Sequence, residues 1–299
     1  MAEKANEIRL ATRDEASRQK EIWRLCFGDS DEFIDFFFAH KYKEDETMVL
    51  LHNGEVAARL TMLPVKLVTP AREVFHGSML YAVATHPENQ NQGFAGRLMN
   101  YTHRFLREKN KAFAVVVPAE QGLFDFYRKH GYQEGFYLTE TLLTKDKLES
   151  LLFADAGRCV LQSVTPQEYN LIRNQILNGC LYISYHDEEV SYQKRLSQFS
   201  GGDILRIDTE KTPGLAAIER LSPKKILVKE ILAPGHMLTF AAKEISKRFP
   251  AEEYIFRTTA FLRGSWEGNT RPFAMIRTTP GTGLKITPGD LGYLGLAFD

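Results

Sequence analysis

One stretch of twenty residues, 81–100, constrains the fold and function of this chain more than any other. It begins as an apolar strand, passes through a loop that starts at His86-Pro87, and enters an amphipathic helix through residues 90–96. The first N–H groups of a helix have no partner inside it and carry a partial positive charge of about 0.5. Small residues there let a phosphate approach the backbone. The stretch therefore predicts a pyrophosphate site.

Other glycine-rich phosphate loops do not match this stretch. In a dinucleotide-binding loop the first turn glycine would stand at Gln92, and no acidic residue clearly ends a following strand. A Walker A loop would require Gly-Lys-Ser/Thr, which is absent from the sequence here. A structural alternative stays open, in which Gly93 only starts the helix and Gly96 only permits close packing.

The spacing Gln90-x-x-Gly93-x-Ala95 resembles motif A of the GNAT superfamily, which holds the pyrophosphate of CoA after a strand such as residues 81–85. Downstream, residues 122–132 resemble motif B of the same superfamily, with Phe126-Tyr127 followed by Gly131-Tyr132. The two motifs stand in the expected order. The resemblance implies an acetyltransferase that uses acetyl-CoA as co-substrate and needs no metal.

The resemblance also implies which residues hold the cofactor. Backbone groups of Val83, Ala84 and Thr85 would meet the pantetheine arm, whose amides can pair with an exposed strand edge. The pyrophosphate site would comprise Gln90, Asn91, Gln92, Gly93, Phe94, Ala95, Gly96 and Arg97. Arg104 is a further candidate for the nucleotide phosphates, with a solvated helix face as the alternative.

Tyr127 is the candidate general acid, because the family places its acid at this position of motif B and a phenol can protonate a thiolate. The alternative is an aromatic packing residue. The backbone N–H of Val83 is the candidate oxyanion donor. No general base stands out, since Met79 occupies the position where histone-type members carry a glutamate. Glu120 and His86 are nearby in sequence, but helix-cap or loop roles suit them better.

The first half of the chain predicts a mixed α/β fold with a central sheet. Asn53-Gly54 between apolar runs is typical of a β-hairpin, and the aromatics Phe33, Phe36 and Phe37 recur on one helix face. The expected strands are residues 7–11, 48–52, 55–68, 78–85 and 112–117, with two strand-like stretches through residue 143; the expected helices are residues 16–27, a second helix after residue 31, 93–109, 122–130 and 145–153.

A small polar break at residues 154–158 predicts two domains, 1–153 and 154–299. Beyond it the order of elements recurs in outline, with strands at 159–164, 203–207, 215–220, 226–232 and 254–261, and helices at 166–177, 187–199 and 235–248. We expect a second, degenerate GNAT-like domain. The link Ala233-Pro234-Gly235 is too short to wrap a pyrophosphate, so this domain would shape the acceptor site instead.

Composition excludes several function classes. Lysine plus arginine equals aspartate plus glutamate, 38 against 38, which gives no reason to expect a nucleic-acid partner. The sequence lacks a membrane-spanning run and a signal-peptide core, which predicts a cytoplasmic protein. Cys26, Cys159 and Cys180 are too widely spaced to suggest a disulfide framework or a zinc site.

The two-domain pattern resembles the enhanced intracellular survival family, whose members acetylate amines and place their C-terminal carboxylate in the active site. Phe298-Asp299 is a candidate for the same role. Residues are too few here for that family's third domain. The resulting hypothesis is N-acetylation of a primary amine on a small molecule. The alternative is a non-catalytic acyl-CoA sensor or interaction module. The sequence does not indicate an oligomeric state.

Overall fold

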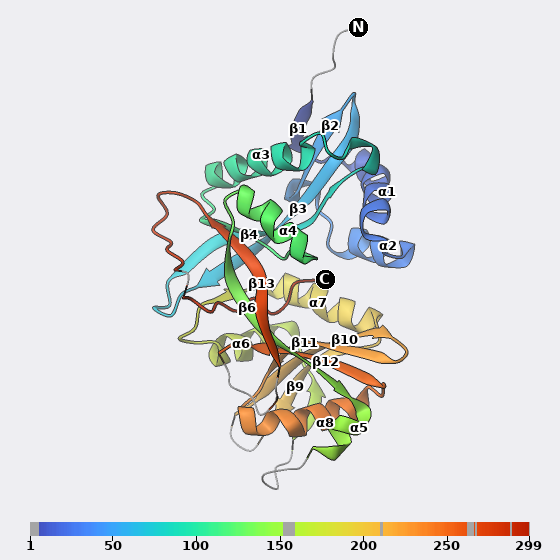
Figure 1. Ribbon diagram of the computed structural model, residues 1–299, viewed down its shortest axis with the longest axis vertical. Helices are drawn as coiled ribbons and strands as arrows, with labels where there is room; N and C mark the ends of the chain where they lie inside the picture. The colour runs from blue at the N-terminus through green and yellow to red at the C-terminus, as the bar shows by residue number, and fades with distance from the viewer. Residues whose placement is uncertain are drawn as a thin grey trace. The chain divides into compact units, whose positions relative to one another are not determined.

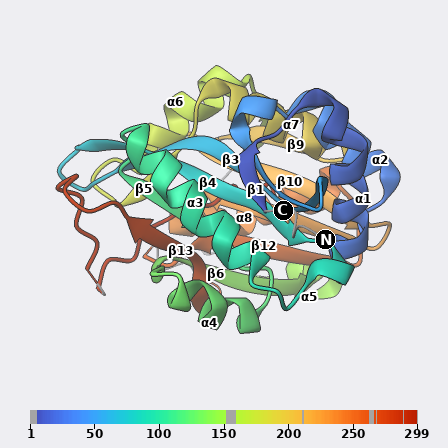
Figure 2. The ribbon, with the colours of Figure 1, turned by 90° about the horizontal axis from the view of Figure 1, so that it is seen from above.

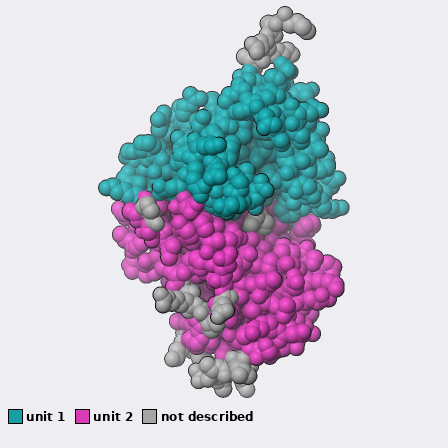
Figure 3. Space-filling view, viewed as in Figure 1, with its two compact units in different colours: residues 1–66, 75–133, 275–285 teal, residues 67–74, 134–274, 286–299 magenta. Residues whose placement is uncertain are grey.

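The structure is a computed structural model, which describes residues 6–151, 159–209, 212–261, 266, 268–287 and 289–298. The chain divides into two compact units (Figure 3). Unit 1 comprises residues 1–66, 75–133 and 275–285, and unit 2 comprises residues 67–74, 134–274 and 286–299. The break expected at residues 154–158 lies outside the described residues. The division into domains 1–153 and 154–299 therefore stays a prediction.

Unit 1 is a mixed sheet with helices on both faces (Figure 1). Its sheet has the order β1-β2-β3-β4-β5, followed by the last residues of β13 (Asn269–Thr278). Strands β4 and β5 run parallel, whereas β1–β2, β2–β3 and β5–β13 are antiparallel. The other elements are β1 (Glu7–Leu10), α1 (Ala16–Phe27), α2 (Asp31–His40), β2 (Thr47–His52), β3 (Glu55–Val68), β4 (Val74–Thr85), α3 (Phe94–Glu108), β5 (Phe113–Val116) and α4 (Gln121–Lys129).

Alternation along the strands sends side chains to two cores. Leu50, Leu60 and Leu80 share a cluster with residues of α3 and α4, while Val49 and Val56 pack with Ile22 of α1. Figure 2 shows the long helix α3 crossing the strands, away from α1 and α2. The sheet of unit 1 therefore lies between two helical layers.

Local signals explain several boundaries. Asn53 and Gly54 have φ values of 54° and 87°, which suit the tight turn of the predicted hairpin between β2 and β3. Helix α1 ends at Gly28, whose φ of 71° is left-handed. Helix α2 begins after Ser30, whose side chain accepts a hydrogen bond from the Phe33 N–H at 3.3 Å.

The strands of unit 2 have the order β6-β12-β11-β10-β9-β7, in which β11 and β12 run parallel. A separate apolar core fills this unit, built from strands and from α8. Its elements are β6 (Gln133–Thr144), α5 (Lys145–Ser150), β7 (Val160–Ser163), α6 (Pro166–Ile176), β8 (Tyr182–Ser184), α7 (Asp187–Phe199), β9 (Asp203–Asp208), β10 (Gly214–Ser222), β11 (Lys225–Leu232), α8 (Leu238–Arg248) and β12 (Glu253–Thr259).

The predicted mixed α/β class is confirmed, and some of the element predictions are wrong. The two strand-like stretches expected before residue 143 form one strand, β6, which pairs with β12 over residues 138–144 and has β13 as its other neighbour. Strand β4 begins at Val74 rather than at residue 78. Strands β8 and β13 were not predicted. Among the described helices, none is both long and apolar enough to cross a membrane.

Candidate functional site

Strand β4 extends past its neighbour at the end that leads to the predicted pyrophosphate loop. Pairing between β4 and β5 ends at Leu80 and Val116, where β5 itself ends, but β4 continues to Thr85. Ala82 lies in this extension and has a φ of 48°, an uncommon value for a residue with a side chain. Such a residue kinks the strand and leaves its edge open for another extended chain.

The loop after β4 prepares the start of α3 for an anion. Asn91 and Gly93 have left-handed φ values of 60° and 74°, a backbone pattern that can direct consecutive N–H groups toward one point. Gly93 is the N-cap of α3 and, unlike Ser30 at α2, supplies no side-chain acceptor. A Cβ placed on Gly93 would meet no atom within 4 Å. The first N–H groups of α3 are therefore left to a ligand from outside.

Side chains of this loop brace its backbone. Gln90 Nε2 donates to the Thr85 carbonyl at 3.1 Å, and Gln92 Nε2 donates to the Glu88 carbonyl at 3.4 Å. Arg97 Nη2 donates to the Gln92 carbonyl at 3.0 Å. These three side chains therefore hold the loop together. A phosphate would bind to the backbone N–H groups of the loop and to the guanidinium nitrogens of Arg97 that do not contact Gln92.

Two members of the predicted site have clear packing roles. Phe94 is 2% exposed and belongs to the core of unit 1, so only its backbone faces the loop. A Cβ on Gly96 would come within 2.8 Å of the His130 ring, so the glycine admits α4 beside α3. Gly96 was a candidate for close packing or for phosphate binding, and the contact with His130 supports the packing role.

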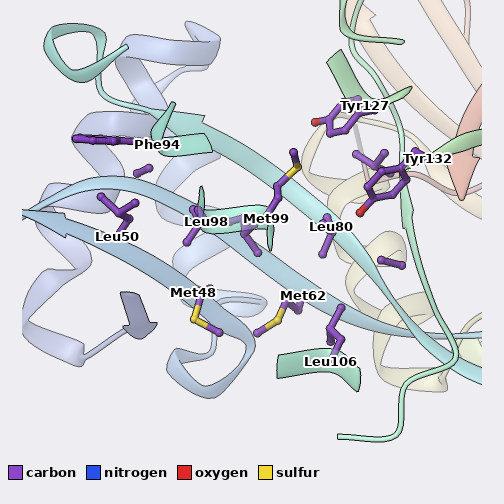
Figure 4. Close-up of a cluster of buried hydrophobic side chains, with 14 of the residues drawn as sticks. Met48, Leu50, Met62, Leu80, Phe94, Leu98, Met99, Leu106, Tyr127 and Tyr132 are labelled. Atoms are coloured by element: carbon purple, nitrogen blue, oxygen red, sulfur yellow. The ribbon is translucent and has the colours of Figure 1, made fainter. Parts of the chain in front are cut away.

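Tyr127 lies on α4 inside the core of unit 1 (Figure 4), and is 5% exposed. It shares that core with Leu80 and Leu98, and Val83 packs against the same cluster. Burial raises the pKa of Tyr127 to about 12. The phenol therefore keeps its proton at neutral pH, as a general acid must.

Behind Tyr127 lies a polar chain that the sequence did not reveal. The Tyr127 and Tyr132 rings meet edge to face, 5.6 Å between centroids, and Tyr132 Oη lies 2.8 Å from His103 Nε2. His103 Nδ1 contacts Arg277 Nη1. Arginine can only donate, so Nδ1 accepts and Nε2 carries the imidazole proton toward Tyr132. Burial, reinforced by the charge of Arg277, lowers the pKa of His103 to about 3.

The residues weighed as general bases have other surroundings. Met79 is 1% exposed and apolar. His86 is buried, and its Nδ1 accepts from the Glu88 N–H at 3.4 Å, which fits the loop role expected for it. Glu120 is exposed at the N-cap of α4 and makes no side-chain capping bond.

The opposite face of the β4 extension carries an aromatic cluster around a buried cation. Tyr81 lies 5.6 Å from Trp23 and 5.5 Å from Phe37, measured between ring centroids. The Arg59 guanidinium lies 5.0 Å from the Trp23 centroid and is fully buried. Phe37 is therefore packed into unit 1.

In unit 2, β11 passes through Ala233-Pro234 and a short 3-10 turn, Gly235–Met237, into α8. No extended loop like that of residues 86–93 separates this strand from its helix, as the sequence indicated. Near the chain end, Phe298 is buried against Tyr185 and Tyr192. Asp299, which carries the candidate carboxylate, lies outside the described residues.

A known family matches part of the chain. Residues 7–135 match the family model of the GNAT acetyltransferase domain. No curated protein sequence matches the chain significantly.

Several solved structures share the fold. A GCN5-related N-acetyltransferase from Anabaena variabilis is 16% identical with a TM-score of 0.71, covering 92% of this chain and 73% of its own. Its counterpart from Kribbella flavida is 12% identical with a TM-score of 0.68, covering 92% and 71%. Eis1 from Mycobacterium abscessus is 11% identical with a TM-score of 0.64, covering 91% and 73%.

The family match over residues 7–135 gives the class of this part of the chain, a GNAT acetyltransferase domain. The two motifs predicted such a domain, and its presence supports a transferase. Over 92% and 91% of its length, the chain is similar in fold to the Anabaena variabilis N-acetyltransferase and to Eis1.

Proposed function

We propose that the protein transfers acetyl from acetyl-CoA to a primary amine of a small molecule, with Tyr127 as general acid. The observation that carries the proposal is the sequence of an open strand edge, a left-handed loop and an uncapped helix start in one continuous segment. Strand β4 extends five residues beyond Leu80, and α3 begins at Phe94, after the N-cap Gly93, which supplies no side-chain cap. An extended ligand with a pyrophosphate at one end matches that order.

The residues present fit acetyl-CoA. Val83, Ala84 and Thr85 would offer backbone groups to the pantetheine arm, although the Thr85 carbonyl already accepts from Gln90 and from Cys26 Sγ at 3.2 Å. The loop residues Gln90, Asn91, Gln92, Gly93, Phe94, Ala95 and Gly96, with Arg97, would hold the pyrophosphate through backbone N–H groups and one guanidinium. Acetyl-CoA, when bound, supplies the activated acetyl group.

The proposed chemistry assigns the chain three tasks. The phenol of Tyr127 holds the proton that the departing thiolate needs, and its pKa of about 12 keeps that proton in place near pH 7. The backbone N–H of Val83 would stabilise the oxyanion as it forms. The incoming amine would lose its proton to water, because Met79 offers no acceptor where a glutamate would stand.

Replacement of the phenol tests the proposal. Thiol release would be followed with aminoglycosides, polyamines, amino acids and peptides as acceptors. Tyr127→Phe keeps the ring and removes the proton, so kcat should fall by about 10²- to 10⁴-fold while acetyl-CoA binds as before. Tyr101→Phe, at a half-buried tyrosine on α3, is the matched control and should retain activity. Equal activity of Tyr127→Phe and wild type would remove Tyr127 from the mechanism.

The second candidate function is a non-catalytic acyl-CoA sensor, which the absence of a carboxylate at Met79 favours. Tight acetyl-CoA binding without thiol release on any acceptor class would establish it in place of the enzyme. We further propose a cytoplasmic location, and domains 1–153 and 154–299 with the second one non-catalytic. The short link from β11 to α8 supports that last point.

A further inference from the structure

A second basic site lies in unit 1, at the other end of α3. A pocket of about 150 Å³ opens there between α3, the start of β5 and the end of β13. Arg104, Arg107 and Arg277 line it together with His103, Asn100 and Thr278. We call it the arginine pocket. A water molecule occupies about 30 Å³ in the liquid, so the volume admits a small oxyanion.

The charges around the arginine pocket are unbalanced. No aspartate or glutamate lines it in the described part of the chain, and none of its three arginines forms an ion pair there with a described carboxylate. Arg104 lies over the Tyr101 ring at 5.6 Å, and Arg277 contacts His103, which is neutral. Three like charges around one hollow repel each other unless an anion joins them.

Ordinary helix chemistry does not explain this arrangement. Arginines often stabilise the C-terminal end of a helix, and Arg107 stands in the last turn of α3. Arg277, however, comes from β13 and belongs to no helix. Guanidinium groups that converge from different elements suit a phosphate, which accepts paired hydrogen bonds.

The arginine pocket lies away from the proposed cofactor loop along α3, and a more open hollow lined by Arg97, Asn100 and Arg104 lies between them. Arg104 lies eleven positions after Gly93, which corresponds to roughly 16 Å along the helix axis. The pocket adjoins Phe113, the first residue of β5, whereas the open edge of β4 lies beyond Val116, the last residue of β5. The two sites thus lie toward opposite ends of the parallel strands.

We propose that the arginine pocket binds a phosphate group of a ligand other than acetyl-CoA. The Arg277–His103–Tyr132 chain runs from this pocket to the ring that packs on Tyr127. A phosphate bound in the arginine pocket reduces the electrostatic effect of Arg277 on His103. Binding should therefore change the NMR signals of the His103 imidazole.

Titration with inorganic phosphate and pyrophosphate, at constant ionic strength with chloride as reference, tests the proposal. Imidazole NMR signals of His103 should shift saturably, with and without saturating acetyl-CoA. Arg107→Gln, which changes an exposed side chain, should weaken the pyrophosphate affinity by tenfold or more and leave acetyl-CoA affinity unchanged. Lys109→Gln, an exposed neighbour outside the pocket, should change neither.

Two results would overturn the proposal. One is a His103 signal that does not respond to either anion, or that responds equally in Arg107→Gln and wild type. The other is loss of the response once acetyl-CoA is added, because the pocket would then belong to the cofactor site. The anion titration does not depend on catalysis by Tyr127. A failure of the proposed acetyl transfer would therefore leave the titration result unchanged, and the two proposals can be refuted independently.

Discussion

Arg59 and Arg173 are both fully buried, and they differ in what meets their charge. Arg173 Nε donates to the two carboxylate oxygens of Glu230, at 3.1 and 2.8 Å. Arg59 Nη2 donates to Thr61 Oγ1 at 2.8 Å, but Nε and Nη1 have no acceptor among the described residues. Burial lowers the pKa of Arg59 to about 10, so it remains charged at neutral pH.

These two arginines should respond oppositely to Arg→Met substitution. Arg173→Met strands the Glu230 carboxylate in the core and should lower the free energy of unfolding by about 3 to 5 kcal/mol. Arg59→Met removes a buried charge that has few hydrogen-bond acceptors and keeps most of the side-chain volume. The free energy of unfolding should therefore stay unchanged or rise. Urea denaturation at pH 7 compares them. A loss in Arg59→Met as large as that in Arg173→Met would contradict the assignment.

His103 should make stability depend on pH. Its pKa is about 3 in the folded protein and near 6.5 when unfolded, so the unfolded chain binds the extra proton between these values. Stability from this group is therefore complete above pH 6.5 and declines as the pH falls toward 3. Unfolding free energies from pH 7 to pH 4 should fall less in His103→Gln than in wild type. The control is His236→Gln, at an exposed histidine. Parallel pH curves for His103→Gln and wild type would refute the low pKa.

At this scale the sequence predicted only part of the site. Tyr127 and Gly93 belong to contiguous motifs, so their positions could be read from local order. His103 and Arg277 lie 174 positions apart, and no local pattern joins them. The kink at Ala82 was equally invisible, because alanine has no preference for positive φ.

Among the elements, the start of α3 depends most directly on one residue. Gly93 adopts a φ of 74°, which costs an L-residue roughly 1 to 2 kcal/mol. Gly93→Ala should therefore destabilise the protein by about that amount and weaken acetyl-CoA binding as the loop relaxes. Gly122→Ala is the matched control, since Gly122 lies in α4 without a left-handed φ and a Cβ there meets nothing within 4 Å. It should stabilise the protein by roughly 0.5 to 1 kcal/mol.

Both glycine variants would be followed by thermal unfolding and by acetyl-CoA titration. Equal changes in the free energy of unfolding for the two variants would mean that alanine adopts the left-handed conformation at position 93 without an energetic penalty. An unchanged acetyl-CoA affinity in Gly93→Ala would separate the loop conformation from cofactor binding.

Elements with strong local signals were predicted, and those made by long-range pairing were not. The β2–β3 hairpin follows from Asn53-Gly54 alone. Strand β13 carries Pro272, which argues against a strand because proline cannot donate to a ladder. Its final residues are nevertheless strand, since Met275–Thr278 pair with β5 from more than 150 positions away.

On the scale of the whole molecule, unit 1 is assembled from segments that lie far apart in the chain. Unit 1 includes residues 275–285, near the end of the chain. Met275 is fully buried in the core of unit 1, and its strand covers the edge of β5. Composition and motifs identify the class of fold. The contribution of residues 275–278 to unit 1 is seen only from their pairing with β5.

A fragment of residues 1–153 should therefore be less stable than unit 1 within the full chain. It lacks the strand Met275–Thr278, so β5 presents an unpaired edge, and exposed edges promote aggregation. It also lacks Met275 from the core and Arg277 beside His103. The fragment should elute partly as aggregate in size-exclusion chromatography and unfold at lower urea, and appending residues 275–285 through a flexible linker should restore part of the loss. If the plain fragment were monomeric and unfolded at the same urea concentration as the linked one, the late strand would be dispensable and residues 1–153 would fold on their own.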